Sequence, residues 1–356
     1  MIENKYTAIG IMSGTSLDGV DLAFCRFTEN DGPWAFQVQQ AETIPYFPEW
    51  KHRLSTSMQT TGKELAFLHV EYGRLLGRMV KRFMSAHHLS PDFIASHGHT
   101  VFHHPGNQFT FQIGSGAEIA IVSEKPVVCD FRTSDVALGG QGAPLVPIGD
   151  QLLFPEFDYC INLGGFANIS FQDDDQRLAF DICPANIVLN KLSQQLGKDY
   201  DMDGLLAASG ELNEDLLLKL NQIAYYSNLP PKSLGVEWLE ENFLPLLSST
   251  YISPVNKLRT VVEHIALQIA HSVKGKTNVQ ILVTGGGAHN QFLIERISQL
   301  SPQHQIILPE ENIIDYKEAL IFAFLGVLRI SGRTNCLKSV TGASTDNIGG
   351  AVYLGG

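Results

Sequence analysis

The segment GIMSGTSLDGVD, residues 10–21, links two runs in which apolar residues alternate, YTAIGIM (6–12) and VDLAFCRF (20–27). Such alternation is typical of strands, and glycines with an Asp-Gly pair between the runs indicate a turn. The chain is therefore expected to open with a glycine-rich β-hairpin. Gly14 and Gly19 allow backbone angles that other residues resist, and a turn of this kind can direct N–H groups at phosphate oxygens. A plain β-turn is the alternative interpretation of this segment alone.

A second segment, DYCINLGGFANISFQ at residues 158–172, repeats this order of strand, glycine turn and strand. The turn is at Gly164 and Gly165, and Asn168 and Ser170 place polar groups in the returning strand. Two such hairpins, about 150 residues apart, predict the two halves of a phosphate clamp. A pair of unrelated hairpins is the alternative.

The residues after the first hairpin alternate between helix and strand patterns. Residues 63–88 have apolar residues at helical spacing, and residues 92–98 and 126–131 are predicted to be buried strands. Two-lobed folds often end with a segment that crosses back. We therefore expect a first α/β lobe of residues 1–130 with about 331–356.

The pattern then starts again, and a second α/β lobe is expected over residues 131–330. Residues 177–182 are predicted to form its third strand, and residues 185–275 to be mainly helical. Residues 279–297 have the pattern of a strand, a glycine turn and a helix, and residues 315–330 that of a long helix.

Composition excludes several classes of protein. The 356 residues suit two domains. A net charge of −12 argues against non-specific binding to nucleic acid or to an anionic membrane, because both need a basic face. Five dispersed cysteines without a C-x-x-C pair, and an N-terminus unlike a signal peptide, indicate a cytoplasmic protein. The longest apolar segment, residues 319–328, is shorter than the roughly 20 residues that span a bilayer. A homodimer is expected as the commonest oligomer.

Three consecutive glycines, Gly285, Gly286 and Gly287, end the predicted strand of ILVTGGGAHN and precede a helix. This arrangement lets a ligand approach the backbone closely, with the N-terminus of the helix directed at it. A ligand-binding turn is therefore predicted here, although the pattern is not a dinucleotide fingerprint.

The segment SHGHTVFHHP, residues 96–105, contains four histidines, of which His97 and His99 share one face if the strand continues. A metal site is one interpretation, but no Glu or Cys stands at matching spacing, so polar contacts to a substrate are favoured. Arg132, in the glycine-rich segment at the lobe boundary, is a candidate partner for a carboxylate through its forked donors. A surface arginine is the alternative.

The segment AFDICPAN, residues 179–186, offers two chemical groups. Asp181 ends a predicted strand and could act as a general base. Cys183 could be a nucleophile, but no base partner or basic neighbour is close in sequence to lower its pKa. The residues therefore favour Asp181.

Together these segments resemble the anhydro-N-acetylmuramic acid kinase family, bacterial sugar kinases of the actin-like and hexokinase-type ATPase superfamily. The resemblance covers nearly the whole chain. It rests on MSGTSLDGVDLA, SHGHTVFHHP, FQIG, VVCDFRTSDVALGGQGAPLVP, NLGGFANIS, DMDGLLAASG, PPKSLG, TGGGAHN and DYKEALIFAFLG, in the order of the family. It implies an α/β, two-lobed actin-like ATPase (ribonuclease H-like) fold with an active-site cleft between the lobes.

The resemblance also implies an activity. The enzyme would use ATP and Mg²⁺, open the 1,6-anhydro ring of anhydro-N-acetylmuramic acid with water, and phosphorylate O6 to give N-acetylmuramic acid 6-phosphate. Asp181 would activate the water, and sugar contacts are implied at His97, Arg132, Asn186 and Glu318. Asp18 is the candidate Mg²⁺ ligand. ATP contacts are expected at Gly14, Thr15, Ser16, Leu17, Asp18, Gly19, Val20, Asp21, Gly164, Gly165, Asn168, Gly285, Gly286 and Gly287.

Two segments depart from the family pattern. The family usually has Asp-Thr-Gly-Pro-Gly-Asn where this chain has DICPAN at residues 181–186, and Thr-Gly-Arg where this chain has LGV at residues 234–236. These departures leave a kinase for a related amino sugar as an alternative. A non-catalytic nucleotide-binding protein of the same fold and a metal hydrolase built on the histidines are the others.

Overall fold

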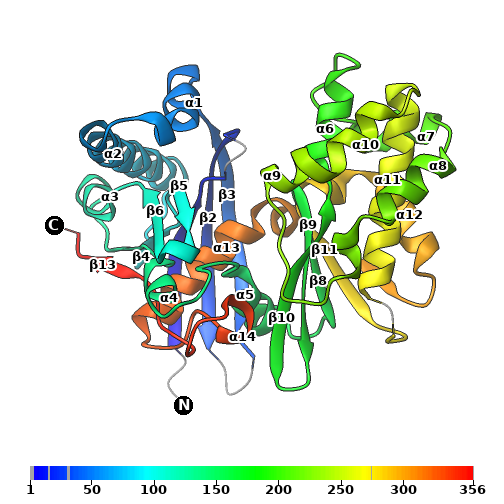
Figure 1. Ribbon diagram of the computed structural model, residues 1–356. Helices are drawn as coiled ribbons and strands as arrows, with labels where there is room; N and C mark the ends of the chain where they lie inside the picture. Colours follow the sequence, from blue (N-terminus) through cyan, green and yellow to red (C-terminus); the bar gives the residue numbers. More distant parts are fainter. Residues whose placement is uncertain (1–3, 15–16, 30–32, 274, 356) are drawn as a thin grey trace. The chain divides into compact units, whose positions relative to one another are not determined.

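The computed structural model describes residues 4–14, 17–29, 33–273 and 275–355. The chain divides into two compact units, which are described separately (Figure 1). Unit 1 comprises Met1–Pro155 and Tyr316–Gly356, and unit 2 comprises Glu156–Asp315. No helix among the described residues has the length and apolar character needed to cross a membrane.

Unit 1 is built on a six-stranded sheet with the strand order β13-β7-β4-β1-β2-β3. The strands are β1 (Asn4–Met12), β2 (Gly19–Glu29), β3 (Ala35–Pro45), β4 (Phe93–Ser96), β7 (Val127–Cys129) and β13 (Ala351–Tyr353). β2 is antiparallel to both β1 and β3, whereas β1, β4 and β7 are parallel. A small separate sheet pairs β5 (His99–His104) with β6 (Phe109–Ile113).

Helices cover both faces of this sheet. They are α1 (Pro48–Ser55), α2 (Gly62–His87), α3 (Gly116–Ser123), α4 (Thr133–Ala137), α5 (Val146–Leu153), α13 (Glu311–Ile330) and α14 (Lys338–Thr341). Ile9 and Ile11 pack with α2 and α3 on one face, and α13 lies against the other (Figure 1). A Cβ at Gly10 would lie 1.8 Å from the carbonyl oxygen of Ala319 in α13. Glycine at this position therefore lets the helix contact the strand backbone.

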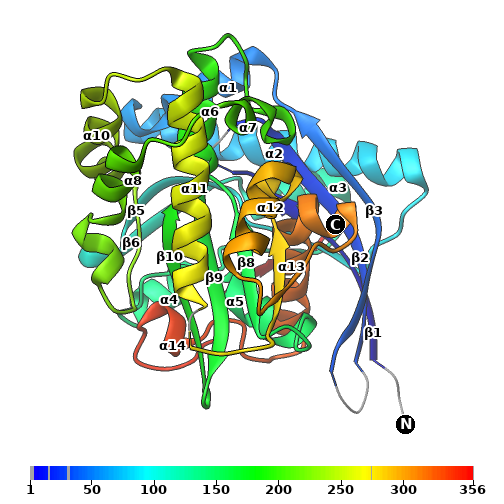
Figure 2. The same cartoon turned by 90° about the vertical axis from the view of Figure 1, so that its right-hand side faces the viewer.

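Unit 2 is built on a five-stranded sheet with the order β10-β9-β8-β11-β12. The strands are β8 (Tyr159–Leu163), β9 (Phe166–Asp173), β10 (Gln176–Pro184), β11 (Gln280–Thr284) and β12 (Gln305–Ile307). The helices are α6 (Asn186–Gln194), α7 (Leu205–Ser209), α8 (Glu214–Asn221), α9 (Val236–Trp238), α10 (Leu244–Ser249), α11 (Pro254–Ser272) and α12 (Gln291–Leu300). Figure 2 shows α11 and α12 in front of the sheet. Ile161, Leu163 and Ile169 are buried beneath the helices.

The two units share one topology. In each, three antiparallel strands are followed by two strands parallel to the first, so that unit 1 has the order β3-β2-β1-β4-β7 and unit 2 the order β10-β9-β8-β11-β12. This duplicated arrangement is the one expected for an actin-like ATPase of ribonuclease H-like units. The predicted fold class and both predicted glycine hairpins are confirmed.

The boundaries of the units differ from those expected at residues 130 and 330. They lie at Pro155 and Tyr316 instead, because residues 131–155 and most of α13 pack into unit 1. A Cβ at Gly149 of α5 would lie 2.7 Å from Ile321 of α13. Such long-range packing leaves no mark in the local sequence.

Candidate active site

The first hairpin of unit 1 contains the predicted phosphate loop. Thr15 and Ser16 lie outside the described residues. Gly19 pairs with β3, and a Cβ there would lie 2.7 Å from the carbonyl oxygen of Ile44. Leu17 adopts a left-handed φ of 59° and packs against the core, whereas the side chain of Asp18 is exposed. Glycine is therefore required at position 19 by β3, independently of any ligand.

Three buried hydroxyl groups hold the base of this hairpin. Ser13 Oγ lies 2.7 Å from the hydroxyl of Tyr46 and 2.8 Å from that of Tyr72, and the two tyrosine hydroxyls are 2.5 Å apart. Each hydroxyl can donate one hydrogen bond and accept one within the ring. The backbone N–H of Tyr46 also donates to the carbonyl of Asp18 over 3.4 Å. The ring thus ties β1 to α2 and to the far end of the loop.

Two carboxylates of the predicted site lie near one another in unit 1. Asp21 of β2 accepts a hydrogen bond from Thr43 Oγ1 over 2.7 Å. Burial and, second, the charge of Asp21 raise the pKa of Glu318 in α13, whereas Arg132 and Lys317 act in the opposite direction. Glu318 therefore lies within electrostatic range of Asp21 and Arg132.

His97 and Arg132 form a hydrogen-bonded pair. The guanidinium of Arg132 contacts His97 Nε2 through Nε at 3.1 Å and through Nη2 at 2.8 Å, and Nη1 donates to the carbonyl of Gly142 over 2.6 Å. His97 Nδ1 lies 2.9 Å from the carbonyl of Gly98. An imidazole that accepts from arginine at Nε2 and donates from Nδ1 is neutral. Burial and the charge of Arg132 lower the pKa of His97 well below the usual range.

His97 and His99 were expected to share one face if the strand continued, and the strand does not continue. β4 ends at Ser96 and β5 begins at His99, and Gly98 between them has a φ of 74°. The backbone therefore turns at the glycine, which is a conformation that residues with a Cβ resist.

In unit 2, Asp181 lies in a row of polar residues that crosses three strands. It is paired with Asn168 of β9, and Asn168 is paired with Asn162 of β8. Residues paired across strands point to the same face. Since Ile161 and Leu163 face the core, this row lies on the opposite face of the sheet. Asn162 was not predicted as a site residue, and its only signal is its polar character between two buried apolar neighbours.

The loop that follows α8 encloses the backbone and side chain of Asp181. The backbone N–H of Leu234 donates to Asp181 Oδ2 over 2.8 Å, and the Tyr225 hydroxyl donates to the Asp181 carbonyl over 2.5 Å. No hydrogen bond to Asp181 Oδ1 is made within the described part of the chain. Burial raises the pKa of Asp181, and the hydrogen bond from Leu234 opposes this. A carboxylate with one oxygen fixed, one oxygen open and an elevated pKa is suited to accept a proton.

The three residues that depart from the family pattern beside Asp181 belong to the core. β10 has a bulge between Asp181 and Cys183, which directs Ile182 and Cys183 into the same hydrophobic cluster. Ile182 is 2% exposed, and Cys183 and Ala185 are fully buried. Burial raises the pKa of the Cys183 thiol. These side chains therefore pack beneath the sheet, and the sequence-based preference for Asp181 over Cys183 agrees with the inert position of the thiol.

Two glycine turns meet at the carboxyl ends of β8 and β11. A Cβ at Gly285 would lie 2.4 Å from Asn162 Oδ1, and one at Gly287 would lie 2.7 Å from Leu163. At Gly165 and Gly286, by contrast, the nearest atoms would be 3.8 Å away. Gly285 and Gly287 are thus required by packing, whereas Gly165 and Gly286 leave room for a ligand.

Asn186 bonds to the first of these turns and lies beside the second, where a Cβ at Gly287 would be 3.1 Å from its Oδ1. Its Nδ2 donates to the carbonyl of Leu163 over 2.9 Å, and its backbone N–H donates to the carbonyl of Gly164 over 3.1 Å. α6 begins at this residue. The N-terminus of α6 and both turns therefore form one site, at the edge where parallel α/β sheets bind ligands.

The segment DMDG, residues 201–204, packs beside the second of these turns. Asp201 accepts hydrogen bonds from the backbone N–H groups of Leu206 and Ala207 over 2.8 and 2.9 Å. A Cβ at Gly204 would lie 2.2 Å from Oδ1 of Asn290, which caps α12. The segment thus supports the glycine turn that precedes α12.

The candidate metal ligand Asp18 has an exposed side chain. Among the residues that the structure describes, no three His, Cys, Asp or Glu side chains could jointly hold a metal ion. Mg²⁺ commonly uses one or two carboxylates together with water and substrate phosphates. The donor set therefore fits an ion that arrives with a phosphorylated ligand.

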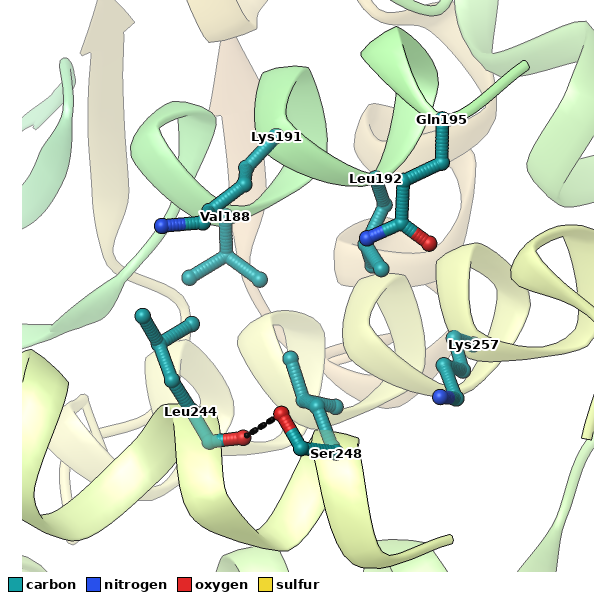
Figure 3. A pocket seen from close by; sticks show the side chains of 8 residues that line it. Val188, Lys191, Leu192, Gln195, Leu244, Ser248 and Lys257 are labelled. Carbon is teal, nitrogen blue, oxygen red and sulfur yellow. Dashed lines mark hydrogen bonds between the residues drawn. The ribbon is translucent and has the colours of Figure 1, made fainter. Parts of the chain in front are cut away.

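A cavity of about 200 Å³ lies among α6, α10 and α11 in unit 2 (Figure 3). Val188, Leu192 and Leu247 contribute apolar surface, and Lys191 and Lys257 contribute their side chains. None of the predicted site residues lines this cavity. It is therefore separate from the site formed by the glycine turns.

A duplicated α/β unit with glycine turns at strand ends is the fold of the actin-like ATPases, the class that contains hexokinase-type sugar kinases. The family model described as anhydro-N-acetylmuramic acid kinase matches residues 6–355. The chain belongs to this family.

Two curated relatives carry the same name. The protein from Pseudomonas syringae pv. syringae (strain B728a) is 33% identical, with 97% of this chain and 98% of the relative covered. The protein from Pasteurella multocida (strain Pm70) is 36% identical, with 97% and 96% covered. Among solved structures, the activator of the 2-hydroxyisocaproyl-CoA dehydratase from Clostridium difficile matches with a TM-score of 0.43 and 14% identity over 93% of this chain and 97% of that one. The family membership depends on the sequence relatives and not on that distant likeness.

Proposed function

We propose that this protein is an ATP-dependent kinase that converts 1,6-anhydro-N-acetylmuramic acid into N-acetylmuramic acid 6-phosphate. The oxygen of water bonds to C1 as the C1–O6 bond breaks. O6 then takes the γ-phosphoryl group of ATP, and ADP is released. The proton removed from water passes to Asp181. This chemistry needs a base beside the sugar, because the substrate has no free O6 hydroxyl.

The observation that carries the proposal is the environment of Asp181. Oδ2 is held by the N–H of Leu234, Oδ1 makes no hydrogen bond within the described residues, and burial raises the pKa. Asn168, one of the predicted ATP contacts, and Asn162 continue the polar row beside it. A purely nucleotide-binding protein would have no use for a half-buried carboxylate with an open oxygen at this point.

Other residues would bind and orient the substrates. Arg132, fixed by His97, would hold the carboxylate of the muramic acid side chain, and Glu318 would accept from sugar hydroxyls. Gly165 and Gly286 would accommodate the nucleotide, and the loop from Gly14 to Asp21, including Thr15 and Ser16, would bind phosphates. Mg²⁺, with Asp18 as one candidate ligand, would neutralise phosphate charge. Val20, Gly164, Gly285 and Gly287 would shape these loops, and Asn186 would contact the sugar.

The buried positions of Ile182, Cys183 and Ala185 remove one of the two grounds for a related amino sugar, because these departures do not alter the polar face of the sheet. The other departure, at residues 234–236, is tested by the choice of substrates below. The substrate class is a fragment of the bacterial cell wall, so the enzyme would act in peptidoglycan recycling. We expect it in the cytoplasm, as a homodimer.

The test is an assay of the purified protein with ATP, Mg²⁺ and anhydro-N-acetylmuramic acid, in which ADP and sugar phosphate are both measured. Reaction in ¹⁸O-labelled water should place the label on C1 and leave the phosphate unlabelled. N-acetylmuramic acid and N-acetylglucosamine serve as competing substrates. ATP binding without sugar-dependent ADP release would show a non-catalytic protein, and faster turnover of either control sugar would replace the proposed substrate. Inhibition by a zinc chelator that leaves Mg²⁺ in place would favour a metal hydrolase.

A further inference from the structure

Asp135 of α4 is a fully buried carboxylate that joins two distant parts of unit 1. Oδ1 accepts hydrogen bonds from Thr341 Oγ1 at 2.8 Å, Asn347 Nδ2 at 2.9 Å and Cys336 Sγ at 3.0 Å. Oδ2 accepts from the backbone N–H of Gly142 at 2.7 Å. Three donors from the C-terminal segment thus meet one oxygen, and a donor from the glycine-rich loop meets the other.

Gly142 connects this carboxylate to Arg132. The N–H of Gly142 donates to Asp135, and its carbonyl accepts from Arg132 Nη1 over 2.6 Å. The chain around it has little freedom to move. A Cβ at Gly140 would lie 2.2 Å from Asp135 Oδ2, and one at Gly142 would lie 2.7 Å from Val136 Cγ2. The backbone of Gly142 therefore links Asp135 to the guanidinium of Arg132, and a shift of Asp135 would displace the guanidinium.

A backbone contact reinforces the connection. The N–H of Gln141 donates to the carbonyl of Thr341 over 2.8 Å, and the N–H of Ser344 donates to the carbonyl of Leu138 over 3.0 Å. The C-terminal segment and the glycine-rich loop are thus held together from both sides of Asp135. A buried charge is tolerated only when hydrogen bonds satisfy it, and here both oxygens are satisfied by this loop and this segment.

We propose that Asp135 is a positioning residue that orients Arg132 for the sugar through Gly142. The proposal rests on the proposed function, because Arg132 is taken to contact the substrate. Asp135 itself touches neither substrate nor cofactor.

Asp135→Asn separates this role from a general contribution to stability. An asparagine that keeps Oδ1 toward the three C-terminal donors presents its amide N–H groups to the N–H of Gly142, and two donors repel one another. The variant therefore breaks the link to Gly142 and retains the link to the C-terminal segment. Thr341→Val is the matched control, because it removes one donor to Oδ1 and leaves Gly142 in contact with Oδ2.

The expected result for Asp135→Asn is a rise of about 10- to 100-fold in KM for the sugar, or an equal fall in kcat/KM, with KM for ATP changed by less than about twofold. Thr341→Val should lower the melting temperature and change KM for the sugar by less than about threefold. Equal effects of the two variants on KM, or no effect of Asp135→Asn, would overturn the proposal.

Gly142→Ala provides a second variant if Asp135→Asn does not fold. Its Cβ displaces the loop from Val136 and leaves the contacts of Asp135 with the C-terminal segment in place. It should reproduce the selective rise in KM for the sugar, and a KM equal to that of the wild type would overturn the proposal.

A readout that is independent of activity is the ¹⁵N NMR signal of the His97 imidazole in the substrate-free protein. His97 is contacted by Arg132 and the Gly98 carbonyl, packs on the ring of Phe322, and is within electrostatic range of His99. Displacement of Arg132 in Asp135→Asn should shift Nε2 and raise the pKa of His97. Unchanged His97 signals would overturn the positioning role even in an active enzyme. A wild-type protein without sugar-dependent turnover, but with the His97 shift in the variant, would instead refute the proposed function alone.

Discussion

Replacement of Asp181 by asparagine is the sharpest test of the proposed mechanism. The side-chain oxygen of the asparagine would still accept the N–H of Leu234, which lies 2.8 Å from Asp181 Oδ2 in the wild type. The amide nitrogen would replace the open oxygen, and it has no lone pair available for a proton. The substitution thus removes the base and keeps the shape of the site.

The size of the effect follows from this geometry. General base catalysis contributes about 10²- to 10⁴-fold, which corresponds to roughly 3–5 kcal/mol in the activation free energy. A neutral acceptor weakens the hydrogen bond from Leu234 by about 1 kcal/mol, and the relief of a buried charge offsets this loss. We therefore expect kcat/KM to fall by two to four orders of magnitude, while the free energy of unfolding changes by about 1 kcal/mol or less.

The assay measures ADP and sugar phosphate over a range of pH. The carboxylate must be ionised to act, and burial raises the pKa of Asp181, so wild-type kcat/KM should fall as pH decreases through that raised value. This acid limb should be missing in Asp181→Asn. A variant with more than about a tenth of wild-type kcat/KM, or with the same acid limb, would refute the assignment of Asp181 as the base.

Three further outcomes follow from the core of unit 2. Cys183→Ala should lower the free energy of unfolding by about 1 kcal/mol and leave kcat/KM within about threefold, and a hundredfold loss would restore a chemical role for the thiol. Burial lowers the pKa of His264 from 6.5 to about 3, so this residue alone should contribute a fall of about 1.4 kcal/mol per pH unit to the free energy of unfolding measured in urea below pH 6.5. His97, whose pKa is also lowered, adds to the total, so the test is the difference in slope between the wild type and His264→Gln, and an equal slope in the two would contradict this. Gly204→Ala should cost about 2–4 kcal/mol, because its Cβ would lie 2.2 Å from Asn290 Oδ1 at a φ of 72°. Gly197→Ala, with a φ of 74° and open space, should cost only about 1 kcal/mol; similar losses would refute the packing argument.

Local patterns predicted the hairpins well, because a glycine turn between alternating strands is encoded within about 15 residues. Strand β3 was not predicted. Its sequence, AFQVQQAETIP, has no buried position, so hydrophobic alternation gave little signal. The strand forms because its backbone pairs with β2, and its side chains play a smaller part.

Long-range relations lie outside what such patterns contain. Asp135 meets Thr341 and Asn347 across about 200 residues, and no local feature of TSDVALGG indicates that contact. The same holds for the unit boundaries, which depend on where α5 and α13 pack. The preference for Asp181 over Cys183 could be derived from the sequence, because no base partner or basic residue is close to Cys183. The core location of Ile182 depends on the bulge in β10, which the sequence pattern does not indicate.

The ring of hydroxyl groups of Ser13, Tyr46 and Tyr72 affects the charge near the loop that it holds in place. The ring contains three protons and three acceptors, so each hydroxyl donates one hydrogen bond and accepts one within the ring. Burial raises the pKa of Tyr46 and raises that of Tyr72 well above its usual range, so both phenols stay protonated and uncharged at neutral pH. These hydroxyl groups would therefore hold the loop Gly14–Asp21 without adding negative charge near a bound phosphate. A carboxylate in place of one of the hydroxyl groups would repel the phosphate.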